Sequence, residues 1–225
     1  MGEFNFVEQV AVPLPAVVLT ELLGLPAGGR DRLLGWANST LRPGAAPRAR
    51  DTLSTMQEII AIALEHGRST HTESMLGRLV QAETLSSGEL TGLLFYLVLV
   101  WYEVLVDVIA GAVLAFSTCP TQLDESTSAP DPFAAVDELL RFLPPQVLAG
   151  PRFAMSDIEM GGQRITGQTV LLCLAAANHD PERFSHPDEL DAHWPRLRAI
   201  GDENAISWRS GFRHRGPLTL PVKPR

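Results

Sequence analysis

Residues 90–116 read Leu-Thr-Gly-Leu-Leu-Phe-Tyr-Leu-Val-Leu-Val-Trp-Tyr-Glu-Val-Leu-Val-Asp-Val-Ile-Ala-Gly-Ala-Val-Leu-Ala-Phe, and this stretch decides the fold. It is apolar on nearly every side and far longer than a globular strand, which predicts a helix surrounded by the rest of the chain. Ser86 and Glu89 fit a capping box at its start, and Pro120 marks its end. A membrane span of about 20 apolar residues is the competing interpretation. The charge of Glu103 in the middle of the run favours the buried helix.

The bulk composition of the chain limits its class. Its 225 residues are 45% hydrophobic, enough for a substantial core, and they predict a single domain over residues 1–225. The formal net charge is -8 and no run of basic residues breaks it, which argues against nucleic acid or an anionic membrane as a partner. Cys119 and Cys173 form no metal-ligand pattern, and the first residues lack a signal peptide. We therefore expect a cytoplasmic protein.

Apolar spacing and helix-breaking residues predict a mainly α fold with a small β portion. Pro13 and Pro15 are expected to break a first helical stretch, and Gly24 to end it. A polar run over residues 121–130 predicts a solvent loop. Helices are expected at residues 16–23, 31–41, 52–65 (with Met56, Ile59, Ile60 and Ala63 on one face), 72–81 and 132–142, and strands at 153–159, 163–174 and within 206–222.

Several motifs of the second half occur in a recognisable order. They are Glu138-Leu-Leu-Arg141, Arg152-x-Ala, and the runs at residues 157–165 and 174–191. This ordered set resembles the cytochrome P-450 superfamily, the heme-thiolate monooxygenases, and particularly its soluble actinobacterial members. The resemblance implies a reduced cytochrome P-450-like fold around one long central helix. It also implies a structural role for the Glu138–Arg141 pair.

Other features of that superfamily are missing from the sequence. Its cysteine loop, which supplies the thiolate ligand of the heme iron, has no counterpart between Trp194 and Trp208, and neither Cys119 nor Cys173 matches its position. The superfamily's Ala-Gly-x-Glu/Asp-Thr corresponds to residues 100–105, which keep the acid and lose the alcohol. The N-terminal portion that closes over the heme is absent as well. These departures imply a truncated, heme-free homologue that has no cofactor and is not a monooxygenase.

Glu103 is the first candidate for chemistry, because a carboxylate in an apolar setting has a raised pKa and can serve as a general acid or base. Tyr102 is a second candidate for proton transfer. Trp101, Leu105 and Asp107 are expected to line the same pocket, with Trp101 and Tyr102 filling space that small residues leave open in the superfamily. The alternative is that Glu103 is a vestigial acid satisfied by a buried hydrogen-bond donor.

Two further features of the sequence are candidate binding sites. Arg152 is similar to the superfamily's arginine that contacts a heme propionate, so it is either part of the pocket, binding some other carboxylate, or a surface ion pair. His179, His186 and His193 recur every seven residues beside aspartates. Metal ligands must converge in space and not only in sequence, and this segment matches a superfamily stretch that binds none, so no metal site is expected.

Two functions from different classes follow from these expectations. The first is an auxiliary protein of bacterial natural-product biosynthesis that binds and activates a partner enzyme, such as a deoxysugar glycosyltransferase. The second is a heme-independent cyclase or isomerase that acts on an apolar, polyketide-like small molecule, with Glu103 as general acid or base. A partner protein would expose a broad apolar patch, whereas an enzyme would enclose a pocket. The sequence also leaves an oligomer open.

Overall fold

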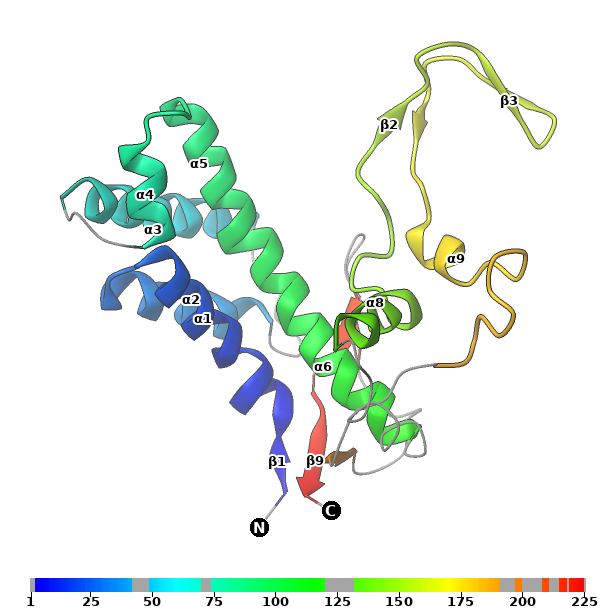
Figure 1. Ribbon diagram of the computed structural model, residues 1–225, viewed down its shortest axis with the longest axis horizontal. Helices are drawn as coiled ribbons and strands as arrows, with labels where there is room; N and C mark the ends of the chain where they lie inside the picture. The colour runs from blue at the N-terminus through cyan, green and yellow to red at the C-terminus, as the bar shows by residue number, and fades with distance from the viewer. Residues whose placement is uncertain are drawn as a thin grey trace.

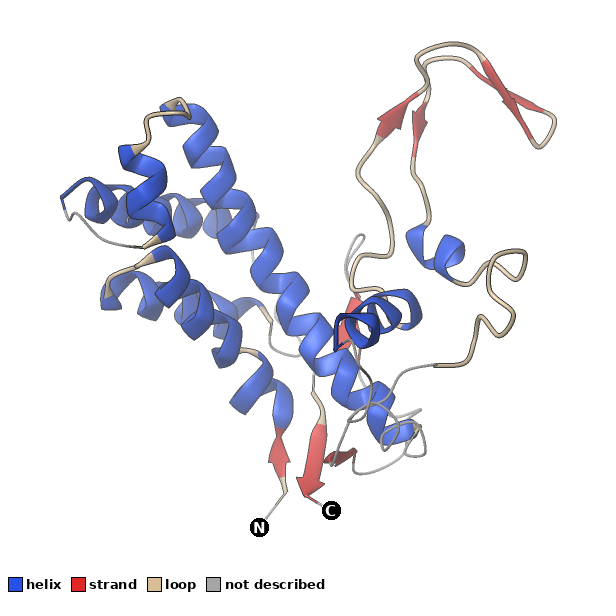
Figure 2. Cartoon of the chain, in the orientation of Figure 1, coloured by secondary structure: helices blue, strands red, loops and turns tan. Residues whose placement is uncertain are grey.

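Helices dominate the computed structural model, and its strands are short (Figures 1 and 2). The structure describes residues 3–41, 49–69, 74–119, 132–190, 197–199, 208–210, 215–217 and 219–224. The predicted fold class, mainly α with a small β portion, is confirmed. The loop expected at residues 121–130 lies outside these residues, as do Pro120 and His193.

The apolar stretch forms one continuous helix made of α5 (Ser87–Phe95), the π-helical segment η2 (Tyr96–Trp101) and α6 (Tyr102–Thr118). The predicted capping box is present: Ser86 Oγ accepts from the amide of Glu89 at 3.3 Å, and the Glu89 carboxylate accepts from the amide of Ser86 at 2.8 Å. Hydrogen bonds from the Ser86 side chain and backbone hold the pKa of Glu89 below its usual value. The helix ends at Thr118, and Pro120 is outside the described residues.

Replacing the cap residue tests how much the start of this helix contributes to stability. Ser86→Ala removes the acceptor of the Glu89 amide and is expected to lower the free energy of unfolding by about 1 kcal/mol. Ser87→Ala, one residue further on and outside the capping box, is the matched control and should change it by less than about 0.5 kcal/mol. Urea denaturation of both variants measures the difference, and equal effects would contradict a stabilising cap.

The π-helical segment keeps one side of the helix against its neighbours. The fully or nearly buried residues follow at a spacing of four: Leu90, Leu94, Val98, Tyr102, Val106 and Ala110. In an ideal α-helix each step of four overshoots a full turn by about 40°, so such a stripe would wind around the helix. The wider π turn offsets part of this rotation. The stripe therefore stays on the side that meets the other helices.

Four helices and a short π-helical turn form a layer on that side of the central helix (Figure 1). They are η1 (Val7–Ala11), α1 (Pro13–Leu23), α2 (Ala27–Thr40), α3 (Ala49–Ser69) and α4 (Met75–Gln81). In this layer η1, α1 and α3 contact the central helix, and α2 and α4 pack on α1 and α3. The predicted apolar face of α3 is buried.

The expectation that Pro13 and Pro15 break the first helix is wrong, because Pro13 occupies its first position, where the missing amide costs nothing. The second helix also begins earlier than expected, at Ala27.

Gly24 ends α1 as predicted, in the left-handed region with φ +67. A Cβ at this position would lie 2.6 Å from the Cβ of Ser74, the N-cap of α4. The tight turn thus also sets how closely α1 and α4 approach.

Residues 132–178 form an arm that starts beside α6 and extends away from the helices (Figure 1). It begins with α8 (Pro132–Phe142), followed by β2 (Arg152–Phe153), β3 (Ile158–Met160), β4 (Gln163–Ile165), β5 (Thr169–Val170) and α9 (Leu174–Asn178). The predicted hairpin is confirmed, with Gly161 and Gly162 at positive φ between β3 and β4. The predicted strands were too long, and Leu174 begins a helix instead of ending a strand.

The remaining strands join the two ends of the described chain. β9 (Pro221–Pro224) lies between β1 (Phe4–Asn5) and β6 (Leu197–Ala199), and both pairings are antiparallel. β7 (Trp208–Ser210) pairs with β8 (Arg215–Pro217), which confirms strands within residues 206–222, with Gly216 inside a strand and not in the turn. α6 packs against β6 and β8. The central helix is therefore covered on one side by the N-terminal helices, and its second half, α6, is also covered by strands and α8.

Candidate functional site

The residues expected to form a site lie on and just after the π-helical segment. Trp101 is its last residue, and 49% of its surface is exposed, whereas Tyr102 is fully buried. Adjacent residues point to different sides of a helix, so these two aromatic side chains do not form one wall. The expectation that Trp101 and Tyr102 line a common pocket is not supported by this geometry.

Tyr102 is held by the helices that pack on the central helix. Its hydroxyl donates to the carbonyl oxygen of Val12 at 2.8 Å, and its ring lies 6.0 Å from that of Trp36. Burial raises the pKa of Tyr102 well above its usual value. A hydroxyl so placed joins the central helix to the start of α1. This geometry supports a structural role for Tyr102. It does not support the predicted catalytic role, which stays a prediction.

Glu103 and Asp107 differ in burial although they are one turn apart. Asp107 is 5% exposed and Glu103 is half-buried, as is Leu105. Both carboxylates interact with other groups of the chain, which agrees with the general rule that buried charges have partners. Two pockets formed by described residues lie elsewhere, one between α2 and α3 and one beside Pro26, and neither is lined by Glu103. The role of Glu103 as general acid or base stays a prediction.

Glu138 and Arg141 form a two-pronged ion pair on α8, with both nitrogen–oxygen distances at 2.7 Å. The side chains are only 16% and 10% exposed. Arg141 also donates to three carbonyl oxygens, those of Asn178 at 3.1 Å, Pro187 at 2.6 Å and Glu189 at 2.6 Å. Such bidentate, charge-assisted bonds are strong and fix geometry. The pair therefore fastens residues 178–189 to α8, as its predicted structural role requires.

His179 supports the same junction. Its Nδ1 lies 3.0 Å from a carboxylate oxygen of Asp188, and its Nε2 lies 3.1 Å from the carbonyl oxygen of Phe142. Both ring nitrogens are thus engaged within the chain. Among the described residues no group of three or more His, Cys, Asp or Glu side chains is placed to hold a metal ion. His193 lies outside those residues.

Arg152 is the first residue of β2, and its side chain is exposed. Its Nη1 lies 3.4 Å from the carbonyl oxygen of Gly150 and 3.5 Å from that of Pro151. These long contacts leave most of the guanidinium open. Within the described part of the chain it forms no ion pair, so it is accessible to a carboxylate.

Comparison with known proteins identifies the family. The profile of the family described as Cytochrome P450 matches residues 130–196. Cytochrome P450 CYP107DY1 of Priestia megaterium is 32% identical over 200 residues, which cover 83% of this chain and 48% of that protein. Polyketide biosynthesis cytochrome P450 PksS of Bacillus subtilis is 29% identical over 195 residues, covering 83% and 48%. The ligand-free structure of the P450 monooxygenase TamI gives a TM-score of 0.80 at 27% identity, covering 98% of this chain and 64% of that one.

The chain belongs to the cytochrome P450 family. It spans about half the length of the curated relatives it matches, 48% in both cases. The predicted cytochrome P450-like fold around one central helix is confirmed, because the solved structure superposes over nearly the whole chain.

The expectation that the chain has no cofactor is corrected by these comparisons. The proteins that it matches are cytochromes P450, and heme is the cofactor of that family. The expectation rested on missing motifs, whereas the similarity extends over most of the chain. The cofactor that the family implies for this cytochrome P450 chain is therefore heme.

The two cysteines test how well the described residues fit a thiolate-bound heme. Cys119 caps the C-terminal end of α6, with its Sγ 3.8 Å from the hydroxyl of Thr118, about 24 Å along the helix from Glu103. Cys173 is exposed at the start of α9, which packs on α8. Neither thiol is beside the middle of the central helix. The described residues of the cytochrome P450 chain offer Arg152 as a carboxylate contact, but their thiols do not fit axial ligation of the iron.

The sequence did not predict the π-helical segment, which ends at Trp101 and immediately precedes Tyr102 and Glu103. Such segments are often found at functional sites. The only signal for it was the spacing of four in the buried stripe, between the 3.6 of an α-helix and the larger period of a π-helix. That signal is visible only once the buried residues are known.

Proposed function

We propose that this cytochrome P450 chain acts in bacterial natural-product biosynthesis as a cytoplasmic auxiliary protein that binds a partner enzyme through its central helix. The observation that carries the proposal is an exposed aromatic pair on the π-helical segment. Tyr96 is 52% exposed and Trp101 is 49% exposed, on a helix that has a buried stripe on its other side. We name the surface made by Tyr96, Trp101 and the half-buried Leu97 and Val100 the central-helix face.

The central-helix face has the composition of a protein-binding surface. The most apolar 18-residue window of residues Ser87–Thr118 has a mean hydropathy of 2.2, and only 44% of it is buried. Tyrosine and tryptophan are the side chains most often found at the energetic centre of interfaces, because they combine a large apolar area with a polar group. A helix with this amount of uncovered apolar surface is best stabilised by another macromolecule.

A membrane is the other medium that could cover such a helix, since its length and composition are those of a membrane span. Three features favour a protein. One side of the helix is already occupied by the stripe that contacts the other helices. Glu103 and Asp107 lie in its middle, and a charge there is costly in lipid. The net charge of -8 also opposes binding to an anionic lipid surface.

The charge and the relatives narrow the class of partner. An acidic chain, with a formal net charge of -8, is complementary to an apolar surface that has a basic rim. One relative is by its name a polyketide biosynthesis protein. An enzyme that modifies a polyketide-like product, with a deoxysugar glycosyltransferase as the first candidate, therefore fits best. The proposed role concerns binding and requires no chemistry at Glu103.

Co-expression with the biosynthetic enzymes encoded beside it tests the proposal. A stable complex in size-exclusion chromatography, with a raised rate of transfer, is the expected result. The variant Tyr96→Ser/Trp101→Ser should weaken binding at least tenfold, since each aromatic residue at the centre of an interface contributes about 2 kcal/mol or more.

The matched control changes two exposed apolar residues on a different helix. Val18→Ser/Leu22→Ser alters α1, where both side chains are 50% exposed, and should leave binding intact. Loss of the complex in this control but not in the aromatic variant would move the interface to α1 and overturn the proposal. A chain that stays monomeric and leaves every neighbouring enzyme unchanged would overturn it as well.

A further inference from the structure

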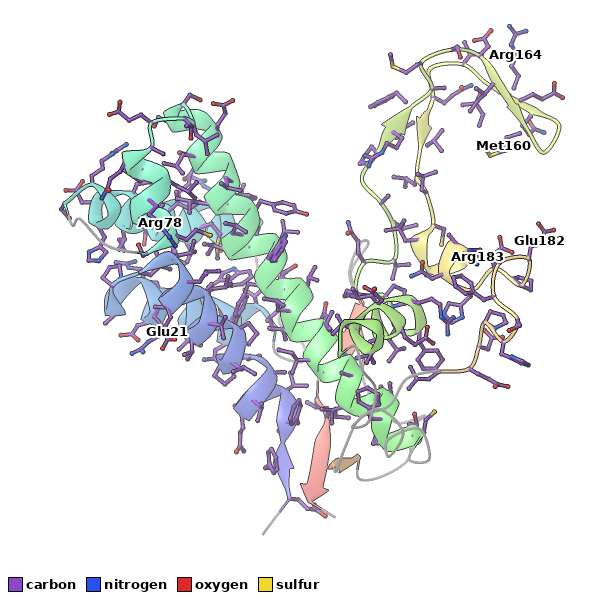
Figure 3. The ribbon with its side chains drawn as sticks, in the orientation of Figure 1. Glu21, Arg78, Met160, Arg164, Glu182 and Arg183 are labelled. Carbon is purple, nitrogen blue, oxygen red and sulfur yellow. The ribbon has the colours of Figure 1, made fainter. Side chains whose placement is uncertain are left out.

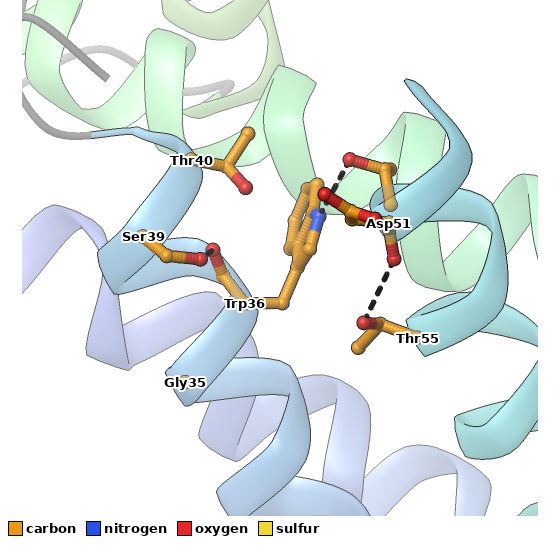
Figure 4. A pocket seen from close by; sticks show the side chains of 7 residues that line it. Gly35, Trp36, Ser39, Thr40, Asp51 and Thr55 are labelled. Atoms are coloured by element: carbon orange, nitrogen blue, oxygen red, sulfur yellow. Dashed lines mark hydrogen bonds between the residues drawn. The ribbon is translucent and has the colours of Figure 1, made fainter. Parts of the chain in front are cut away.

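A polar pocket lies between the end of α2 and the start of α3, away from the central-helix face (Figure 4). Its volume is about 440 Å³, within the range of small-molecule sites. Seven residues line it: Gly35, Trp36, Ser39, Thr40, Asp51, Thr52 and Thr55. Four of them carry hydroxyl groups and one a carboxylate, a composition unlike that of the apolar core beneath it.

The hydroxyl of Thr40 marks the pocket as a binding site. Its Oγ1 is shielded from solvent and makes no hydrogen bond within the described structure, and it points toward Trp36 (Figure 4). Buried polar groups nearly always have partners, and leaving one without a partner is unfavourable. Both the donor and the acceptor capacity of this hydroxyl are therefore unused within the described structure.

The other hydroxyl groups of the pocket already make hydrogen bonds within the chain. These bonds determine whether each hydroxyl can still donate or accept. The hydroxyls of Ser39 and Thr55 donate to the carbonyl oxygens of Trp36 at 2.8 Å and Asp51 at 3.0 Å, which leaves them as acceptors. Thr52 accepts from the indole Nε1 of Trp36 at 3.3 Å, so its own proton remains available as a donor. The pocket thus offers more acceptors than donors.

Asp51 gives the pocket its charge. Its carboxylate is exposed and makes no hydrogen bond or ion pair within the described part of the chain. Of the nearby arginines, Arg32 is ion-paired with Glu58, and Arg50 does not line the pocket. No cation of the described residues that line the pocket neutralises this charge, which lies beside the ring of Trp36 (Figure 4).

We infer that this pocket, which we name the α2–α3 site, binds a small hydroxylated ammonium compound of the amino-sugar class. A protonated amine satisfies the Asp51 carboxylate and the spare lone pairs of Ser39 and Thr55. Ring hydroxyls of the ligand pair with Thr40 and with the free proton of Thr52, and the apolar face of the ring packs beside Trp36. An acceptor-rich site with one uncompensated negative charge selects such a cation over a neutral sugar.

Binding can be followed at Trp36 with simple probes. D-glucosamine titrated into the ¹⁵N-labelled full chain should shift the indole N–H signal of Trp36 to saturation, with a dissociation constant in the millimolar range or tighter. The signal is assigned by its loss in Trp36→Phe. D-glucose and N-acetylglucosamine, which have the ring without the charge, should bind at least tenfold more weakly. No saturable shift, or equal affinity for the neutral sugars, would overturn the inference.

Two variants separate binding from folding. Thr40→Val removes the unpaired hydroxyl while keeping the shape, so it should weaken glucosamine binding about tenfold and leave the melting temperature unchanged or raised. Asp51→Asn should remove the preference for glucosamine over glucose, and Asp31→Asn, an exposed acid on α2 outside the pocket, should leave it intact. Full binding in Thr40→Val, or an unchanged preference in Asp51→Asn, would overturn the inference.

Discussion

Replacing Arg141 by alanine is expected to lower the free energy of unfolding by about 3–5 kcal/mol, and the melting temperature by about 10 °C or more. The change leaves the Glu138 carboxylate without its partner in a place that is only 16% exposed. It also removes the donor to three carbonyl oxygens, one on the last residue of α9 and two in the segment that follows it. Breaking a largely buried pair is costly mainly because of the charge that remains.

The control for this prediction is another arginine in an ion pair. Arg164 pairs with Asp157 on the hairpin, where its side chain is 75% exposed and projects from the arm (Figure 3). Arg164→Ala should cost less than about 1 kcal/mol, because exposed pairs contribute little. Differential scanning calorimetry of the two variants gives the comparison. If both lost the same stability, the Glu138–Arg141 pair would not be the anchor of the arm.

Tyr102→Ala is expected to have an effect of similar size, about 3–5 kcal/mol, because it opens a cavity in the core. Tyr102→Phe keeps the ring and loses only the hydrogen bond to Val12, so it should cost about 1 kcal/mol. Urea denaturation separates the two contributions. Equal losses in the two variants would mean that the hydroxyl, and not the packing of the ring, accounts for the effect.

The pH dependence of stability provides a second test of Tyr102. Burial raises the pKa of Tyr102 in the folded protein, whereas the unfolded chain ionises near pH 10. Above that pH only the unfolded state releases this proton. Stability that is fully present below pH 10 is therefore lost as the pH rises, by at most about 1.4 kcal/mol per pH unit from this group. Tyr102→Phe should lack that part of the alkaline decline, and an identical decline in both proteins would contradict the buried hydroxyl.

Local chemistry explains which parts of the fold could be predicted from sequence. The buried face of α3 follows from apolar spacing, and Met56, Ile59, Ile60 and Ala63 are all buried. The capping box and the Gly161-Gly162 turn also depend only on neighbouring residues. The prolines of α1 were misjudged because a proline breaks a helix interior but suits a first turn, and the sequence does not show where the turn begins.

Long-range pairing explains much of what could not be predicted. The amide of Leu220 donates to the side-chain oxygen of Asn5 at 3.3 Å, across 215 positions of sequence, and nothing local indicates that contact. The three carbonyl partners of Arg141 are also non-local, at separations of 37, 46 and 48 positions, although the Glu138–Arg141 pair itself was predicted from its spacing and family resemblance. The α2–α3 site was missed because hydroxyl side chains on two helices look like ordinary surface residues until the helices are placed.

The π-helical segment Tyr96–Trp101 has a consequence for engineering and divergence of this helix. Each residue of an α-helix turns the chain by about 100°. Deleting one residue within the segment, with relaxation to a regular α-helix, would leave the residues after Trp101 in nearly the same orientation relative to Leu90 and Leu94, because the wider turn already accommodates one additional residue. Substitutions that made the segment regular without changing its length would instead turn Glu103 and Asp107 toward new neighbours. The length of the segment and the width of its turns together therefore set which way the second half of the helix faces.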